Sequence, residues 1–234
     1  MTHEEQQKIW NNEHETPHVL LQMDSKDVSG GVEKFFDLLK NRKLSELVGI
    51  EMCCGKGRNV IGLVKQGEIK KMYGFDFSPT AIETAKERAR EEKVSDKTEF
   101  SVGDAIKAWP YDDNTFDFVI DCFGSTDIED AHGRKNAIAE IYRVLKPGGF
   151  LLLYTLSLDD EFHKEMILRQ PAEERNSFYH DNGKFEKTFD EEEIRATYNS
   201  FSIVEWERPE KVTQFFGKDY ACRHFWVVFQ KPIN

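Results

Sequence analysis

Residues 47–59 read LVGIEMCCGKGRN, an apolar run that ends in an acid and a turn of small residues. The run predicts a buried strand over 47–52, and Gly55 and Gly57 predict a tight turn that leads into a helix. In α/β proteins such a turn lets a ligand approach the backbone and the free N–H groups of the helix start. The stretch therefore predicts a nucleotide-type site at the carboxyl end of the first strand.

Apolar segments that alternate with helical patterns predict the rest of the sheet. The further strands are expected at residues 71–76, 100–103, 116–121 and 150–155. Two β-rich segments near the end, 201–206 and 224–229, have only a loop expected between them and predict an antiparallel pair. The expected fold class is α/β, a doubly wound, mostly parallel seven-stranded sheet with an antiparallel C-terminal strand pair.

The 234 residues are expected to form a single domain, because this length suits one core and the composition does not force a second. Residues 1–45 are expected to be a helical segment ahead of the first strand. Residues 157–187 break the alternation with charges, Pro171 and aromatic side chains. They are therefore expected to be an insertion over the carboxyl edge of the sheet.

The composition narrows the classes of partner. The net charge is −11 and the Lys and Arg residues form no basic stripe, so nucleic acid is not an expected partner. No apolar run is long enough to cross a bilayer and residues 1–10 are polar, which predicts a cytoplasmic protein without a membrane partner. The four cysteines form no CxxC pair and have no His at a metal-finger spacing, which predicts reduced thiols and no metal site.

Two acids indicate what the predicted site binds. Asp76 ends the second strand, nineteen residues after Gly57, where a carboxylate can accept from both ribose hydroxyls of a nucleoside. Glu51 stands directly before the turn, where its charge would repel a pyrophosphate but suits the ammonium of an amino acid. The third glycine of a dinucleotide fingerprint is also missing. A nucleoside that carries an amino acid is therefore favoured over a dinucleotide.

At these residues the chain resembles the class I S-adenosylmethionine-dependent methyltransferases, over most of residues 47–155. That family's signature is an acid, one residue and then G-x-G-x-G, and here Cys53 replaces the first glycine. Four more motifs match in order. They are GFDFS at 74–78, GDA at 103–105, WPY at 109–111 followed by FDFVI at 116–120, and RVLKPGG at 143–149.

The resemblance implies a Rossmann-like fold, S-adenosyl-L-methionine as cofactor and a residue-level map of its site. The implied contacts are Glu51 with the methionine ammonium, directly or through water; Cys53, Gly55 and Gly57 along the amino-acid part; Asp76 with the ribose; Phe77 against adenine; Asp104 with the adenine amino group; the Ala105 N–H with the ring; and Asp121 and Cys122 beside the methionine. Simpler interpretations stay open, with Asp104 as a turn cap and Cys53 as a small residue in a glycine position rather than a reactive thiolate.

Methyl transfer from a sulfonium is an in-line displacement, in which the protein aligns the reactants and excludes water. A base is needed only if the acceptor loses a proton. His132, after the fourth strand, is the candidate catalytic base, although a lone loop histidine is usually just solvated. Phe123, Phe178 and Tyr179 are candidates for the substrate wall, and the last two are equally candidates for the insertion's own packing core.

Trp10 and the residues after it resemble the lead segment that folds over the cofactor in small-molecule methyltransferases. Residues 9–22 and the insertion are therefore expected to form a lid. The expected function is methyl transfer to a small molecule, with the acceptor atom (O, N, S or C) and the oligomeric state left open. The alternatives are a non-catalytic binding protein, motivated by Cys53, an aminopropyl-like transfer, and protein methylation.

Overall fold

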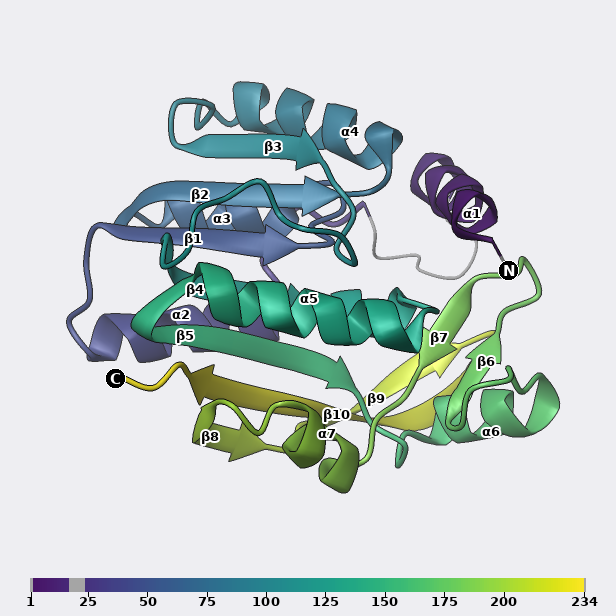
Figure 1. The fold of residues 1–234 in the computed structure, drawn as a ribbon. Coiled ribbons are helices and arrows are strands. Elements are labelled where there is room, and N and C mark those ends of the chain that lie inside the picture. The colour runs from purple at the N-terminus through teal and green to yellow at the C-terminus, as the bar shows by residue number, and fades with distance from the viewer. Residues whose placement is uncertain (1, 17–23, 234) are drawn as a thin grey trace.

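A computed structural model describes residues 2–16 and 24–233, and within them an eight-stranded sheet forms the centre (Figure 1). Its order is β3-β2-β1-β4-β5-β10-β8, and β9 pairs with β10 beside this path. The first five strands are parallel, and β10 runs antiparallel to β5, β8 and β9. The strands are β1 (Leu47–Met52), β2 (Ile69–Asp76), β3 (Thr98–Val102), β4 (Phe116–Cys122), β5 (Leu145–Leu156), β8 (Ser202–Glu207), β9 (Glu210–Phe215) and β10 (Lys218–Gln230). The α/β class and the mostly parallel order are as predicted.

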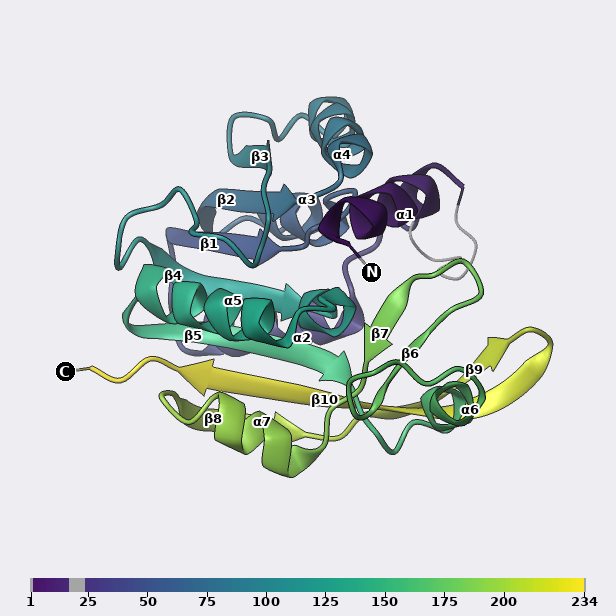
Figure 2. The same cartoon turned by 45° about the vertical axis from the view of Figure 1, so that its right-hand side comes forward.

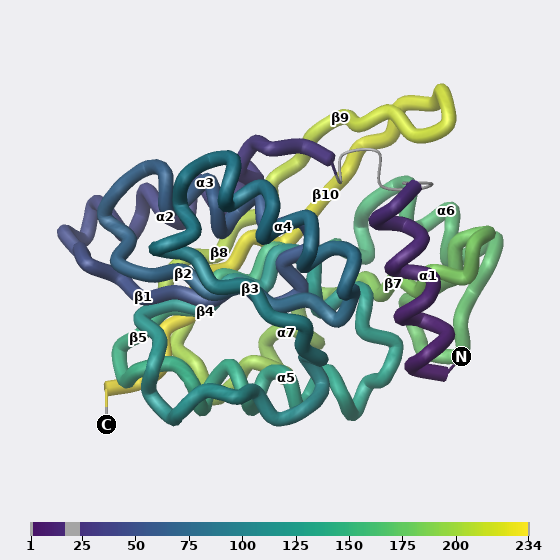
Figure 3. The backbone as a smooth tube through the Cα atoms, turned by 90° about the horizontal axis from the view of Figure 1, so that it is seen from above, coloured from purple at the N-terminus to yellow at the C-terminus, as the bar shows by residue number. Residues whose placement is uncertain are grey.

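Helices cover both faces of this sheet (Figures 1 and 3). On one face pack α2 (Gly30–Asn41), α3 (Arg58–Lys65) and α4 (Pro79–Glu91), and on the other pack α5 (Ala131–Val144) and α7 (Glu191–Thr197). Because both faces are covered, β4 is almost entirely buried, which explains its apolar sequence.

A third group of elements stands beyond the carboxyl ends of the parallel strands (Figure 2). It consists of α1 (His3–Glu15), the turn η1 (Gly124–Asp127), α6 (Glu161–Arg169) and a small hairpin of β6 (Ser177–Tyr179) and β7 (Phe185–Lys187). The proposed insertion, residues 157–187, contains α6 and this hairpin. The proposed lid segment, residues 9–22, lies partly outside the described residues.

Local signals in the sequence account for the bounds of β1 and for the start of α4. β1 has the predicted bounds, and Ser78 caps α4 by accepting from the Ala81 N–H at 3.2 Å, with Pro79 in the first turn. In contrast, β5 begins at Leu145 rather than at residue 150, because Leu145 already pairs with Phe116 of β4. Gly148 and Gly149 then exchange backbone hydrogen bonds of 2.9 Å with Lys231.

The expectation of only a loop between the last two strands was wrong, because β9 lies there and adds an eighth strand beside the path of seven. β10 extends well beyond residues 224–229 and folds back on β9 over six paired residues from Lys218 to Arg223. This longer strand carries Tyr220 and Cys222, which pack against Phe162 and Phe178 of the insertion. The β9–β10 hairpin thus packs against the insertion through this apolar cluster. No helix among the residues described is both long enough and apolar enough to cross a membrane.

Gly49 in β1 gives a test of the packing between sheet and helices. A Cβ at Gly49 would lie 2.2 Å from Cζ of Phe118, whose ring meets Phe35 of α2 edge-on at 5.8 Å. We expect Gly49→Ala to lower the free energy of unfolding by about 1–3 kcal/mol through overpacking, measured by urea denaturation. Gly30→Ala is the control, because a Cβ there meets nothing within 4 Å. Equal stability of both variants would contradict this account.

Candidate functional site

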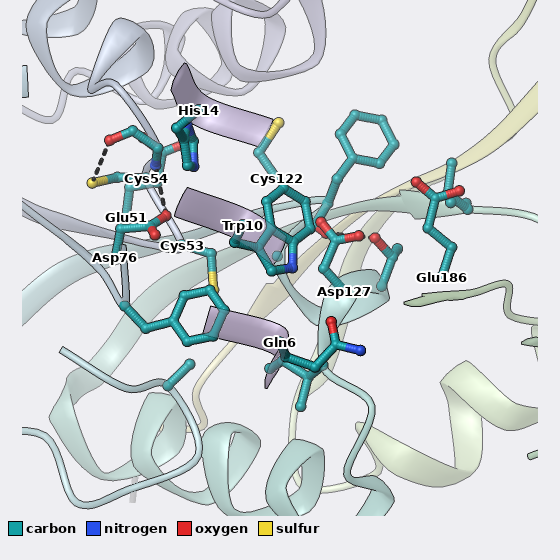
Figure 4. Close-up of a pocket in the computed structure, with 18 of the residues that line it drawn as sticks. Gln6, Trp10, His14, Glu51, Cys53, Cys54, Asp76, Cys122, Asp127 and Glu186 are labelled. Atoms are coloured by element: carbon teal, nitrogen blue, oxygen red, sulfur yellow. Dashed lines mark hydrogen bonds between the residues drawn. The ribbon is translucent and has the colours of Figure 1, made fainter. Parts of the chain in front are cut away.

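A cavity of about 720 Å³ opens at the carboxyl ends of β1, β2 and β4 (Figure 4). Parallel strands bring their carboxyl ends to one edge, where the turns after them can share a ligand. The cavity continues beneath α1 toward the insertion and the β9–β10 hairpin. It therefore has two ends, one formed by the early strands and one formed by elements late in the chain.

The turn after β1 has the left-handed backbone conformation that its glycines allow. Gly55 and Gly57 have φ of +53° and +76°, and Cys53 has φ of +51°. Burial raises the pKa of Cys53 well above its usual value, and the surrounding acids add to this effect. Cys53 therefore lines the cavity as a neutral thiol in a glycine-like conformation, which favours the small-residue interpretation over a thiolate.

Glu51 is a buried acid with one free oxygen. Its side chain is 2 % exposed, and its Oε1 accepts from Nδ2 of Asn59 at 2.6 Å. Its Oε2 is buried and has no hydrogen-bond partner among the residues described. Burial raises the pKa of Glu51 to about 8, so a cation in the cavity would stabilise its charged form.

Asn59 was not among the predicted site residues, yet it orients Glu51. Its Oδ1 accepts from the N–H of Ser29, just before α2, at 2.8 Å, which fixes the amide so that its NH₂ points at the acid. The position of Asn59 in the first turn of α3 does not by itself indicate this role. The hydrogen bond to Ser29 joins residues thirty positions apart, and no local sequence pattern predicts it.

Asp76 connects the end of β2 to the turn after β1. Its Oδ2 accepts from the N–H of Gly55 and its Oδ1 from that of Ser78, both at 2.9 Å. Burial raises the pKa of Asp76 to about 6 although these N–H groups oppose the shift. The next residue, Phe77, lines the cavity and lies tilted against His3 of α1, with ring centroids 5.6 Å apart.

Asp104 and Ala105 lie on the cavity wall after β3. Oδ1 of Asp104 accepts from the Ile106 N–H at 3.2 Å, as a turn cap does, while its Oδ2 lies 3.0 Å from Nε2 of His3. Capping and a role in binding are therefore compatible. Ala105 is held in place because its carbonyl accepts from the indole N–H of Trp109 at 3.1 Å.

The two residues at the tip of β4 have different surroundings. Cys122 lines the cavity, and its thiol contacts Oγ of Ser29 at 3.7 Å. Asp121 is 1 % exposed and is not on the cavity wall, and its Oδ1 accepts from the Ser125 N–H at 3.0 Å. Asp121 therefore stabilises the turn η1 after β4 rather than lining the cavity.

α1 crosses the cavity and contacts both of its ends. Trp10 lines the cavity and carries the ammonium of Lys184 over its ring at 4.9 Å. Nε2 of Gln7 donates to the Phe77 carbonyl at 2.7 Å, and Nδ2 of Asn182 donates to Glu13 at 3.0 Å. The helix thus bridges the end of β2 and the β6–β7 hairpin.

The residues predicted for the acceptor side are not gathered in one place. Phe123 lines the cavity with φ of +65°, and its ring lies tilted against that of Tyr154 with the centroids 4.6 Å apart. Phe178 is fully buried in the packing core of the insertion, and Tyr179 bonds Glu129; neither lines the cavity. His132 is exposed at the start of α5, outside the cavity wall.

A network of ionisable side chains that sequence reasoning did not assemble stands at the far end of the cavity. Glu186 of β7 lies 3.0 Å from Nε2 of His180 and 3.3 Å from Nε2 of His163, and its other oxygen pairs with Lys184. Lys184 also faces Asp127 of η1 at 3.5 Å. These residues are spread over sixty positions, so spacing alone could not reveal them.

Comparisons with known proteins agree with this geometry. Residues 50–149 match a family model described as a methyltransferase domain. A demethylmenaquinone methyltransferase of Lactiplantibacillus plantarum is 34% identical over 113 residues, which cover 48% of this chain and 46% of that protein. A 2-phytyl-1,4-naphtoquinone methyltransferase of Nostoc punctiforme is 33% identical over 100 residues, 42% of each chain. This chain thus matches less than half the length of these relatives.

Solved structures share the fold over more of the chain. A SAM-dependent methyltransferase of Methanosarcina mazei superposes with a TM-score of 0.74 at 24% identity, covering 89% of this chain and all of that one. The [4+2]-cyclase SpnF superposes with a TM-score of 0.66 at 20% identity, covering 86% of this chain and 82% of that one. Since a cyclase has this fold too, the fold alone does not decide the chemistry.

Glu51 gives a pH-dependent prediction. Its pKa is raised from 4.5 to about 8 by burial, so its ionisation destabilises the fold progressively as pH rises between these values. In cofactor-free protein, we expect Glu51→Gln to match the wild type at pH 4 and to be more stable by on the order of 5 kcal/mol at pH 8.5, measured by urea denaturation. Glu83→Gln, an exposed change on α4, should show no such dependence. A constant difference across pH would disprove the buried-charge account.

Proposed function

We propose that the protein belongs to the class I S-adenosylmethionine-dependent methyltransferases and transfers the methyl group of S-adenosylmethionine to a small-molecule acceptor, because residues 50–149 match a methyltransferase domain. When bound, the cofactor supplies an activated methyl group, so the chain has to bind, align and exclude water. The alternatives, aminopropyl-like transfer, protein methylation and binding without catalysis, have no observation of their own in their favour.

The observation that carries this proposal is the unpartnered oxygen of Glu51 inside the cavity. A buried acid with a free oxygen and a raised pKa favours a cationic ligand, and an amino-acid ammonium fits it. Asp76 lies at the end of the neighbouring strand in the same cavity, where its carboxylate suits ribose hydroxyls. Glu51 would hold the ammonium, Asp76 the ribose, and Phe77 with Asp104 the adenine.

The acceptor end is formed by elements outside the matched residues 50–149. α1, the β6–β7 hairpin and the β9–β10 hairpin all contribute to the cavity wall. The quinone substrates in the relatives' names therefore cannot be assigned to this chain from the matched segment. The cavity volume of about 720 Å³ supports a small molecule rather than a nucleic acid as acceptor.

We also propose that the protein acts in the cytoplasm. All four cysteines are free thiols, including the adjacent pair Cys53 and Cys54. Reduced cysteines suit a compartment in which glutathione and thioredoxin keep thiols from pairing.

Calorimetric titration with S-adenosylmethionine and S-adenosylhomocysteine tests the proposed function. We expect the wild type to bind both, and Asp76→Ala to weaken both affinities by about 1–3 kcal/mol, the cost of losing hydrogen bonds to a charged partner. Asp96→Ala, an exposed change before β3, should bind like the wild type. Absence of binding to either compound would refute the function, and unchanged affinity in Asp76→Ala would refute the ribose assignment.

Deletion of residues 1–22 tests the lid hypothesis. The deletion removes Trp10 and the hydrogen bonds of Gln7 and Glu13 that bridge the two ends of the cavity. We expect weaker cofactor binding and slower turnover, because the site loses its cover and admits water. Cofactor affinity measured by calorimetry is compared with the thermal stability of the same protein. If affinity and turnover are unchanged, α1 is not a lid.

A further inference from the structure

Asp127 occupies the junction between the two ends of the cavity. It closes the turn η1, which follows β4 directly, so it lies a few residues beyond Cys122 and Phe123 on the cavity wall. Its side chain keeps 21 % exposure and lines the cavity. Figure 4 shows its carboxylate between Trp10 and Glu186.

One oxygen of Asp127 is anchored and the other is available. Oδ1 lies 3.5 Å from Nζ of Lys184, a residue that is fully buried and does not line the cavity itself. Oδ2 makes no hydrogen bond to any residue that the structure describes. A ligand in the cavity can therefore contact Oδ2, while Lys184 holds Oδ1.

Lys184 is shared with a second acid, which limits how far it can neutralise Asp127. Its ammonium also pairs with Glu186, which His163 and His180 hold from the other side. Burial opposes the charge on Glu186, but Lys184 and His180 lower its pKa well below the usual range, so it stays ionised. Of the two acids that share Lys184, Asp127 is therefore the one whose negative charge is less neutralised.

The surroundings of Asp127 raise its pKa to about 7, because burial and the charge of Glu186 outweigh the attraction of Lys184. A base works best when its pKa lies near the operating pH. The charged or titratable groups around it come from several elements. They are Lys184, Glu186 and His180 on the hairpin, His163 on α6, Glu13 on α1 and Asp76 at the end of β2.

We propose that Asp127 is the catalytic base, taking the proton from a hydroxyl or amine acceptor as that atom attacks the methyl group. This inference rests on the proposed methyl transfer. The acceptor's lone pair forms the new bond to the methyl carbon, while the carbon–sulfur bond breaks and leaves its electron pair on sulfur. The acceptor's proton moves to a carboxylate oxygen of Asp127 and afterwards leaves to water.

Three of the histidines are poorer bases than Asp127. His163 uses both ring nitrogens, on Asp160 at 2.5 Å and on Glu186, and these acids overcome burial and raise its pKa to about 9. It therefore carries a proton already. Burial lowers the pKa of His224 to about 4, and its Nδ1 contacts the hydroxyl of Tyr154 at 3.1 Å. His132 lies outside the cavity wall.

Titration of the cofactor-free protein tests the state of Asp127 without any turnover. Aspartate carboxyl carbons are labelled with ¹³C and followed by NMR in the wild type, in Asp127→Asn and in Asp181→Asn, an exposed change on the same hairpin. We expect one carboxyl that titrates near pH 7 to be missing from Asp127→Asn and present in Asp181→Asn. If the missing carboxyl titrates near pH 4 instead, the proposal is overturned.

Kinetics then separate a base from a residue that only positions the acceptor. The probes are 1,4-naphthohydroquinone and benzylamine, which lose a proton on methylation, and benzyl methyl sulfide, whose sulfur carries no proton to lose. We expect Asp127→Asn to lower kcat about 100-fold for the first two, to remove the acid limb of the pH profile near 7, and to leave KM and the third probe unaffected. An equal loss for all three probes, or no loss, overturns the proposal.

Cofactor calorimetry keeps this test apart from the proposed function. Asp127→Asn should bind S-adenosylmethionine as the wild type does, since Asp127 lies beyond the turns assigned to the cofactor; weaker binding would count against its role as a base. If the wild type itself binds no S-adenosylmethionine, the proposed function fails, whereas the NMR titration of Asp127 is unaffected.

Discussion

The structure depends on acids that are buried at the carboxyl edge of a parallel sheet and are only partly compensated by internal cations. Glu51, Asp76, Asp121 and Asp127 all have pKa values raised by burial. A raised pKa means that ionising these groups costs more in the folded chain than in the unfolded one, so their contribution to stability falls as pH rises toward neutrality. A cationic ligand in the cavity offsets that cost and is stabilised in return. The buried acids at this edge of the sheet thus favour a positively charged ligand even in the ligand-free protein.

This constraint divides the cavity into two parts with different origins. The end assigned to the cofactor is built from turns after β1, β2 and β3, all within the segment that matches the methyltransferase family. The other end is built from α1, the insertion and the β9–β10 hairpin. A family can therefore keep one chemistry while the acceptor changes, because the acceptor wall is supplied by elements that the shared fold does not determine.

The sequence predicted what local patterns encode. The bounds of β1, the Ser78 cap with Pro79, and the placement of Asp76 at a strand end all follow from signals within a few residues. The hydrogen bond between Asn59 and Glu51 and the pairing of Lys184 with Asp127 did not follow, because they join residues that only the folded chain brings together. His132 was chosen by residue type and position after β4, whereas the same stretch of chain places an acid, Asp127, on the cavity wall.

Cys53 shows which contacts set the shape of the turn. A non-glycine residue at φ of +51° carries strain on the order of 1–2 kcal/mol, so its conformation must be imposed from outside. Two neighbours impose it. Asp76 holds the N–H of Gly55 at 2.9 Å, and Gly124 lies so close that a Cβ there would approach Cβ of Cys53 to 2.9 Å. The buried acid that we propose for the ribose is therefore also the group that holds the turn, which is why the turn keeps its shape with Cys53 at the first glycine position.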